Sequence, residues 1–383
     1  METDLYEPPH QEYRATVRAF VRREVVPNLQ RWDAQREVDR ETWKKAGAAG
    51  LVGLAVPERF GGAGVADYRF RFVVGEEIAN VGAAALQSAF ATNDDIVLGY
   101  LLNLADEEQQ ARWLPGFATG ETVAAIAMSE PGAGSDLRGI TTSAVRDGDA
   151  WVLNGSKTFI SNGITADLVV VVARTDPEGG GKGYSLFVVE RGTPGFARGR
   201  KLDKVGLQAQ DTAEMFFQDA RVPARNLLGG EGNGLSALRR NLPRERIGIA
   251  MAAQCSAEAA FRWTLEYVRE RRAFGKAIAD FQTVGFTLAE LRTQIEVTRS
   301  YIDRCVRALN AGTLTAVDAA KAKWWATDVQ WKVIDSGVQL HGGYGYMTEY
   351  PIARAFLDAR VQRIYGGTNE IMKEIIRRDL VRD

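Results

Sequence analysis

Apolar positions follow a helical period in the first third of the chain. The opening stripe ends where Pro27 interrupts it, and it consists of Val17, Phe20, Val21 and Val25. Further segments of helical character cover residues 43–50, 70–81 and 92–104. The pattern therefore predicts a helical region over residues 1–121.

The pattern changes near Thr122, where short β-branched and aromatic segments alternate with Gly, Asp and Pro turns. These segments are TVAAIAMSE, AWVLNGSKTFIS, DLVVVVART, YSLFVVE and AEMFFQ, and they predict an antiparallel β unit. After the glycine-rich LLGGEGNG the helical period returns and continues to the end. Its longest stripe comprises Phe281, Val284, Leu288, Leu291, Ile295, Ile302, Val306 and Leu309.

Helices, then strands, then helices is not the strand–helix alternation of a dinucleotide-binding Rossmann fold. A chain of 383 residues also exceeds one ordinary core. We expect an α+β protein with a helical domain over residues 1–121 and an antiparallel β-barrel-like domain over 122–233. A C-terminal four-helix bundle should follow over 234–383.

Composition narrows the function classes. Lys plus Arg number 48 and Asp plus Glu 49, so nothing suggests a nucleic-acid or anionic membrane partner. With 2 histidines there is little material for a His-rich metal site or a Ser-His-Asp triad, and we expect no metal. Cys255 and Cys305 lie in apolar helical patterns, which suits a reducing compartment. The first ten residues, METDLYEPPH, lack the character of a leader peptide, and no apolar run could span a bilayer. We therefore expect a cytoplasmic location.

Two segments offer groups that could face a ligand. The loop SEPGAGSD, Ser129 to Asp136, follows a strand and exposes hydroxyls and backbone N–H groups, although an ordinary turn has the same composition. The segment RRAFGKAIADFQ, Arg271 to Gln282, presents cations and Phe274 after a helix end, although a solvated helix terminus would look alike.

Together with WVLNGSKTFISNG (151–163), QLHGGYGYM (339–347) and RIYGGTNE (363–370), these motifs resemble those of FAD-dependent acyl-CoA dehydrogenases over essentially the whole chain. The resemblance implies a flavoenzyme that converts an acyl-CoA to a 2-enoyl-CoA, with the β-hydrogen leaving as hydride to flavin N5. It also implies electron-transfer flavoprotein as the acceptor and a homotetramer built as a dimer of dimers.

The same resemblance assigns the cofactor contacts. They are Met128, Ser129, Ser135, Phe159, Ser161, Arg271, Phe274, Gln282, Gln339, Gly342, Gly343, Thr368 and Glu370. Phe159 replaces the usual Trp and Ser161 the usual Thr, while Arg271, Phe274 and Gln282 match residues that serve the flavin of a neighbouring subunit. Ser135, Arg246, Tyr365 and Gly366 match substrate contacts. We interpret His341 as a packing residue.

The usual catalytic glutamate of the family is absent, because Gly366 follows Tyr365. Its backbone N–H can still support the thioester oxygen, and we expect the missing side chain to leave space for a carboxylate from elsewhere. NLPRERIGIA (241–250) resembles the segment that supplies the base in the long-chain and isovaleryl branches, which makes Glu245 the candidate.

Burial would have to raise the pKa of Glu245 for it to act as a base, whereas a solvated carboxylate among neighbouring arginines is the alternative. Pro243 should kink this helix and could aim Glu245 inward. The acyl pocket floor is expected around residues 86–92, with Phe90 as its bulky member. Rival functions are an acyl-CoA oxidase, an acyl-carrier-protein dehydrogenase and a catalytically silent flavin-binding protein.

Overall fold

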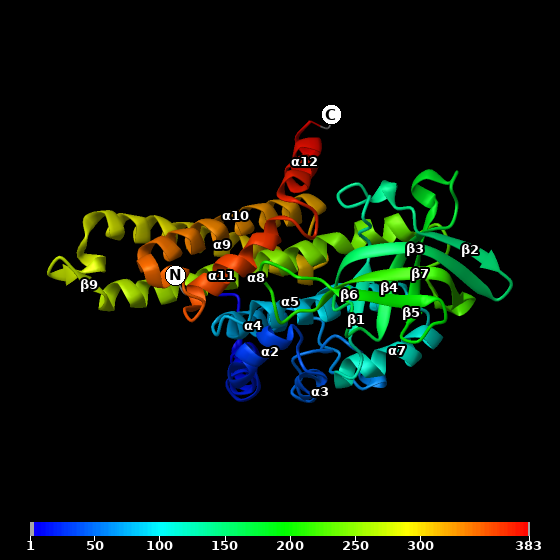
Figure 1. The fold of residues 1–383 in the computed structure, drawn as a ribbon, viewed down its shortest axis with the longest axis horizontal. Coiled ribbons are helices and arrows are strands. Elements are labelled where there is room, and N and C mark those ends of the chain that lie inside the picture. Colours follow the sequence, from blue (N-terminus) through cyan, green and yellow to red (C-terminus); the bar gives the residue numbers. More distant parts are fainter. Residues whose placement is uncertain (1–3, 382–383) are drawn as a thin grey trace.

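The computed structural model describes residues 4–381. Helices of the N-terminal region, a β-sheet and the long C-terminal helices form three packed domains (Figure 1). The sheet lies at one end of the long axis and the far tips of the C-terminal helices at the other. The predicted α+β organisation, with strands between two helical regions, is confirmed.

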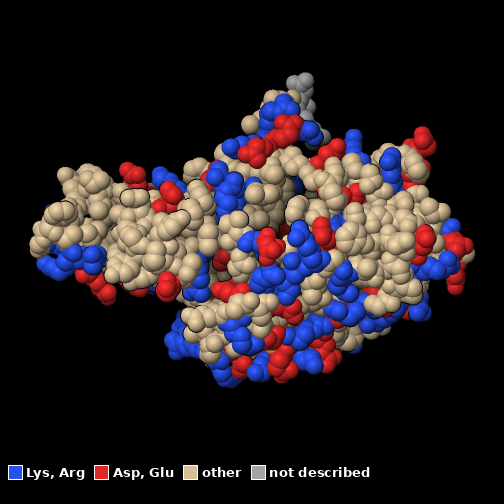
Figure 2. Space-filling view, viewed as in Figure 1, with Lys and Arg blue, Asp and Glu red and all other residues tan. Residues whose placement is uncertain are grey.

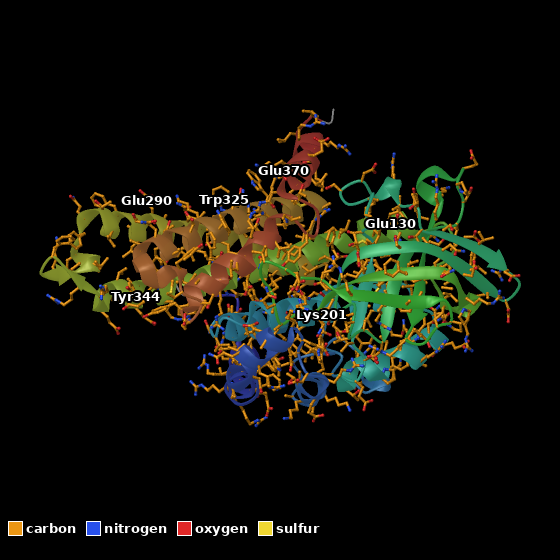
Figure 3. The ribbon with its side chains drawn as sticks, in the orientation of Figure 1. Glu130, Lys201, Glu290, Trp325, Tyr344 and Glu370 are labelled. Carbon is orange, nitrogen blue, oxygen red and sulfur yellow. The ribbon has the colours of Figure 1, made fainter. Side chains whose placement is uncertain are left out.

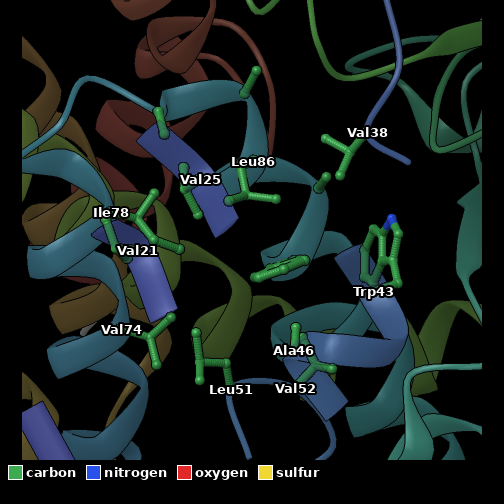
Figure 4. Close-up of a cluster of buried hydrophobic side chains, with 14 of the residues drawn as sticks. Val21, Val25, Val38, Trp43, Ala46, Leu51, Val52, Val74, Ile78 and Leu86 are labelled. Carbon is green, nitrogen blue, oxygen red and sulfur yellow. The ribbon is translucent and has the colours of Figure 1, made fainter. Parts of the chain in front are cut away.

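The N-terminal domain is built from short helices around one apolar cluster. Its α-helices are α1 (Pro8–Phe20), α2 (Leu29–Gln35), α3 (Arg40–Ala48), α4 (Tyr68–Ala79), α5 (Ala84–Ala91), α6 (Leu98–Leu104) and α7 (Glu107–Thr119), with π-helical turns at Val21–Val25 and Thr92–Val97. The predicted stripe Val17, Phe20, Val21 and Val25 is buried against Trp43, Val74 and Leu86, as Figure 4 shows in part. Burial of this stripe is the hydrophobic contribution that holds α1 on the domain.

The middle domain contains one eight-stranded sheet ordered β6-β7-β3-β2-β4-β5-β8, with β1 beside β4. The strands are β1 (Ala124–Ala127), β2 (Ser143–Asp147), β3 (Ala150–Ser161), β4 (Leu168–Arg174), β5 (Tyr184–Glu190), β6 (Phe196–Lys201), β7 (Thr212–Pro223) and β8 (Leu227–Leu228). Most pairs are antiparallel, but β1 and one residue of β2 pair with β4 in parallel. Within residues 4–381 no pairing joins β6 to β8, so the sheet is open rather than a closed barrel.

Strand β4 is apolar on both faces because it separates two cores. Val170 and Val172 pack with residues of α6 and α7, whereas Val169 and Val171 pack with Trp151 and other residues of the sheet. This double burial explains its uninterrupted LVVVV run.

The C-terminal domain consists of long helices that extend from the sheet. They are α8 (Gly234–Glu270), α9 (Gln282–Asn310) and α10 (Ala316–His341), followed by the shorter α11 (Pro351–Ala359) and α12 (Asn369–Leu380). A hairpin of β9 (Arg272–Ala273) and β10 (Lys276–Ala277) joins α8 to α9. Helix α8 also contacts α4, α5, α6 and β5, so it links all three domains. No helix within residues 4–381 is long and apolar enough to cross a membrane.

Candidate active site

Glu245 lies on the buried face of α8. Glu245 is only 4% exposed. This burial excludes the alternative that its arginine neighbours suggested, a carboxylate in contact with solvent. The hydroxyl of Tyr100 on α6 donates a hydrogen bond to Glu245 Oε1 at 2.8 Å. Burial raises the pKa of Glu245 to about 7, against the lowering effects of the Tyr100 hydrogen bond and the Arg246 charge. A carboxyl group with such a pKa suits general-base chemistry near neutral pH.

The inward direction of Glu245 requires no break in the helix. Helix α8 continues through Pro243 from residue 234 to residue 270. Asn241 and Gly248, one turn to either side of Glu245, are also buried, so Glu245 lies on the inner face of α8.

Arg246 joins the segment of Glu245 to the motif of Gly366. Its Nε donates to the carbonyl oxygen of Gly366 at 3.3 Å, across a separation of 120 residues in the chain. Arg246 is itself buried, at 6% exposure. The two segments that the sequence offered as separate candidates therefore meet in one site.

The space beside Gly366 is already filled. A Cβ on Gly366 would lie 2.3 Å from Cδ1 of Ile249, one turn beyond Glu245 on α8. The expectation that a carboxylate occupies this space was wrong, because an aliphatic side chain occupies it. Gly366 and Gly367 also have φ values of +65° and +89°, a left-handed conformation that residues with a side chain rarely adopt.

Lys323 on α10, which was not among the predicted site residues, supports the same loop. Its side chain is fully buried, and its Nζ donates to the carbonyl oxygen of Gly367 at 2.8 Å and to Oδ1 of Asn369 at 2.9 Å. Burial, with the nearby charge of Arg246, lowers the pKa of Lys323 to about 7. Its place on the helical period with the buried Ala319 and Thr327 was the available indication. The sequence held no comparable indication for Tyr100, because an aromatic residue among leucines is typical of any hydrophobic core.

The loop 128–136 and the strand end 158–161 lie side by side at the sheet. The Thr158 N–H donates to the Ser129 carbonyl at 3.0 Å, and Lys157 Nζ donates to the Met128 carbonyl at 3.1 Å. Lys157 also pairs with Glu130, which Figure 3 labels beside the sheet. Ser129 is half-buried and Ser135 is exposed, so both hydroxyls can reach a ligand.

Phe159 is turned out of the sheet at a point where the β3–β7 register is irregular, between Lys157 and Ile160. It is 71% exposed and has φ of 60°. A strained, exposed aromatic residue beside half-buried Ser161 is the kind of feature that a planar ligand would cover.

Six further candidate cofactor residues lie at the opposite end of the molecule. Phe274, on the hairpin after α8, is 95% exposed, and Arg271, Gln282, Gln339, Gly342 and Gly343 are exposed as well. Figure 3 labels Tyr344 at this end, far from Glu130. The ring of Tyr267 stacks on His341, with centroids 4.3 Å apart, which supports the packing interpretation of His341. One chain therefore does not bring these residues to the loop 128–136.

Residues near the Gly366 motif have mixed roles. Thr368 caps α12 by accepting from the Ile371 N–H at 3.3 Å, and Glu370 is exposed. Tyr365 is half-buried, and burial raises the pKa of its hydroxyl well above the usual value. Phe90 packs on Trp43 with centroids 4.8 Å apart and is fully buried in the N-terminal core. Within residues 4–381 no cluster of His, Cys, Asp or Glu could hold a metal ion.

Comparison with known proteins gives consistent matches over the chain. Residues 7–121, 125–220 and 232–381 match the N-terminal, middle and C-terminal domains described for acyl-CoA dehydrogenase. The long-chain specific acyl-CoA dehydrogenase of Sus scrofa mitochondria is 49% identical over 99% of this chain and 88% of its own length.

Solved structures agree with those sequence matches. An acyl-CoA dehydrogenase from Geobacillus kaustophilus is 48% identical, with a TM-score of 0.96 over 98% of this chain and 99% of its own. A glutaryl-CoA dehydrogenase from Mycobacterium smegmatis, solved in complex with FADH2, is 27% identical with a TM-score of 0.92, over 99% and 96% of the two chains.

Proposed function

The chain belongs to the acyl-CoA dehydrogenase family, and from that premise we propose that it removes hydrogen from the α and β carbons of an acyl-CoA to give a 2-enoyl-CoA, with Glu245 as the base. The observation that carries this proposal is the buried Glu245 carboxylate, whose pKa of about 7 lets it be ionised at neutral pH yet accept a proton.

FAD is the cofactor of the family, and when bound it accepts the β-hydrogen as hydride. The residues present fit such a group. Phe159 offers an exposed aromatic face, Ser129 and Ser161 offer hydroxyls, and side chains added at Gly132 and Gly134 would meet nothing within 4 Å, which leaves the loop 128–136 open to a ligand. We propose Met128, Ser129, Ser135, Phe159 and Ser161 as its contacts in this chain.

The chain's own residues divide the proton chemistry. Glu245 takes the α-proton, and the backbone N–H of Gly366 donates to the thioester oxygen as negative charge develops there. Arg246 and Lys323 bind the carbonyls of Gly366 and Gly367, which restrains the loop that carries that N–H. Tyr365 and Ser135 are proposed to line the thioester.

The test is Glu245→Gln, which keeps the shape of the side chain but cannot accept the proton. FAD should remain bound, while flavin reduction by acyl-CoA should fall by at least about 10²–10⁴-fold. Glu266→Gln, at an exposed position on the same helix, is the control and should behave as wild type. Near-normal flavin reduction in Glu245→Gln would exclude Glu245 as the base.

The electron acceptor and assembly are part of the proposal. Electron-transfer flavoprotein should reoxidise the enzyme, and oxygen uptake without an acceptor would instead indicate an oxidase. The exposed Arg271, Phe274 and Gln282 support a homotetramer in which they reach the FAD of a neighbouring subunit, with Gln339, Gly342, Gly343, Thr368 and Glu370 as further contacts. The free, buried Cys255 and Cys305 support a reducing, cytoplasmic location.

A further inference from the structure

Tyr100 is a buried residue of the N-terminal domain whose hydroxyl reaches the proposed base. It is 0% exposed, and its hydroxyl donates to Glu245 Oε1 at 2.8 Å, across 145 residues of sequence. We propose that Tyr100 is a positioning residue that fixes the Glu245 carboxylate and keeps it ionised at neutral pH. The proposal rests on the proposed function of Glu245.

The charged neighbours of Glu245 leave this role to Tyr100. Arg246 stands beside Glu245 on α8, but its Nε donates to the Gly366 carbonyl. Arg244 has its guanidinium over the ring of Tyr68, 5.2 Å from the centroid. In the described part of the chain, Tyr100 is therefore the group from another element that is hydrogen-bonded to Oε1.

The hydrogen bond from Tyr100 and the burial of the side chain shift the pKa of Glu245 in opposite directions. Burial favours the neutral acid, whereas a donated hydrogen bond favours the carboxylate. The pKa of Tyr100 itself is raised well above its usual value by burial, so the phenol stays protonated and acts as donor only. No proton passes through it. The α-proton still moves from carbon to Glu245, and Tyr100 sets how much of Glu245 is ready to receive it.

Tyr100→Phe removes the hydroxyl but keeps the aromatic ring, which packs in the core between α6, α7 and the sheet. Losing a hydrogen bond to a charged group should raise the pKa of Glu245 by about one unit or more. The acid limb of the pH profile for flavin reduction by acyl-CoA should therefore move by about one pH unit to higher pH. Rates should fall about tenfold below the limb and little above it.

The control is Tyr13→Phe, which removes another tyrosine hydrogen bond, to the Gly50 carbonyl at 2.7 Å, away from Glu245. It should leave the acid limb in place. An infrared titration of the Glu245 carboxyl group, identified by its loss in Glu245→Gln, should show the same displacement in Tyr100→Phe without substrate. A purely structural role for Tyr100 would lower thermal stability without moving either titration.

The outcomes separate this inference from the proposed function. If Glu245→Gln is inactive and Tyr100→Phe retains the wild-type acid limb, the role of Tyr100 is wrong while the base assignment stands. If Glu245→Gln keeps its activity, both are wrong. Should Tyr100→Phe lose FAD or fail to fold, 3-fluorotyrosine at position 100 replaces it. This stronger donor should move the limb to lower pH, and an unmoved limb would overturn the proposal.

Discussion

The two ends of α8 differ in how far a single chain supplies partners for their polar groups and covers their apolar side chains. Around Glu245, the carboxylate, both glycine carbonyls and the ammonium of Lys323 have partners within the chain. At the far end, Phe274 is 95% exposed and Phe286 is 61% exposed. Figure 2 shows a largely uncharged area over this end, with acidic and basic residues at its margins.

This difference indicates which part of the chemistry one chain completes. The groups proposed for proton transfer are buried and held within the chain. The groups proposed to reach the cofactor from the hairpin are presented outward, which is typical of residues that a second copy covers. Changes at the first end should therefore act on catalysis within one subunit, and changes at the second should act on assembly and FAD retention.

The largest effect is expected from moving the carboxylate in Glu245→Gly with Gly366→Glu. The new Cβ would meet Ile249 Cδ1 at 2.3 Å in a left-handed backbone, so we expect flavin reduction to remain at least about 10²-fold below wild type. Adding Ile249→Ala removes that contact and should recover part of the activity. Rapid-reaction absorbance of the flavin measures both variants. Recovery of activity without the Ile249 change would mean that Ile249 and the loop at Gly366 rearrange more easily than their buried contact implies.

The sequence predicted the order of the three domains because their hydrophobic periods differ. Through family resemblance it also singled out the segment of Glu245 and the loop of Gly366, which the Arg246 hydrogen bond joins. It could not predict Ile249 beside Gly366, since that contact depends on how α8 and the loop pack. The contact between Phe90 and Trp43 could not be predicted for the same reason, because the sequence does not say which residue a buried aromatic side chain packs against. The hydrophobic period predicts which face of a helix is buried, whereas the residues that contact this face depend on tertiary packing.

At the exposed end, Phe274→Ser should separate assembly from folding. An exposed side chain contributes little to the stability of one chain, within about 0.5 kcal/mol. If a neighbouring subunit covers it, the loss should instead weaken association and FAD binding by about 30-fold, as for an aromatic interface residue. Light scattering and flavin absorbance after gel filtration measure this. An unchanged tetramer with full FAD would contradict the proposed role of the hairpin.

A smaller effect is expected from Lys323→Met at the buried end. Methionine fills a similar volume but leaves the Gly367 carbonyl and Asn369 Oδ1 without their donor, which should lower the free energy of unfolding by about 1–3 kcal/mol. Flavin reduction should slow about tenfold with the acid limb unmoved, because Glu245 keeps Tyr100. Lys321→Met, at an exposed position of α10, is the matched control. Equal behaviour of the two variants would show that the loop does not need Lys323.

The smallest effect should come from Glu370→Gln, although Glu370 lies closer in sequence to Gly366 than Glu245 does. Its side chain is exposed, and hydrogen bonds from its own backbone and from Thr368 lower its pKa, so it is a poorer base than the buried Glu245. We expect turnover per bound FAD within about twofold of wild type, since substitutions at exposed positions cost little. Any loss in total activity should follow flavin occupancy, measured by the ratio of flavin to protein absorbance. A large loss at full occupancy would move the base to α12 and would overturn the assignment that burial favours.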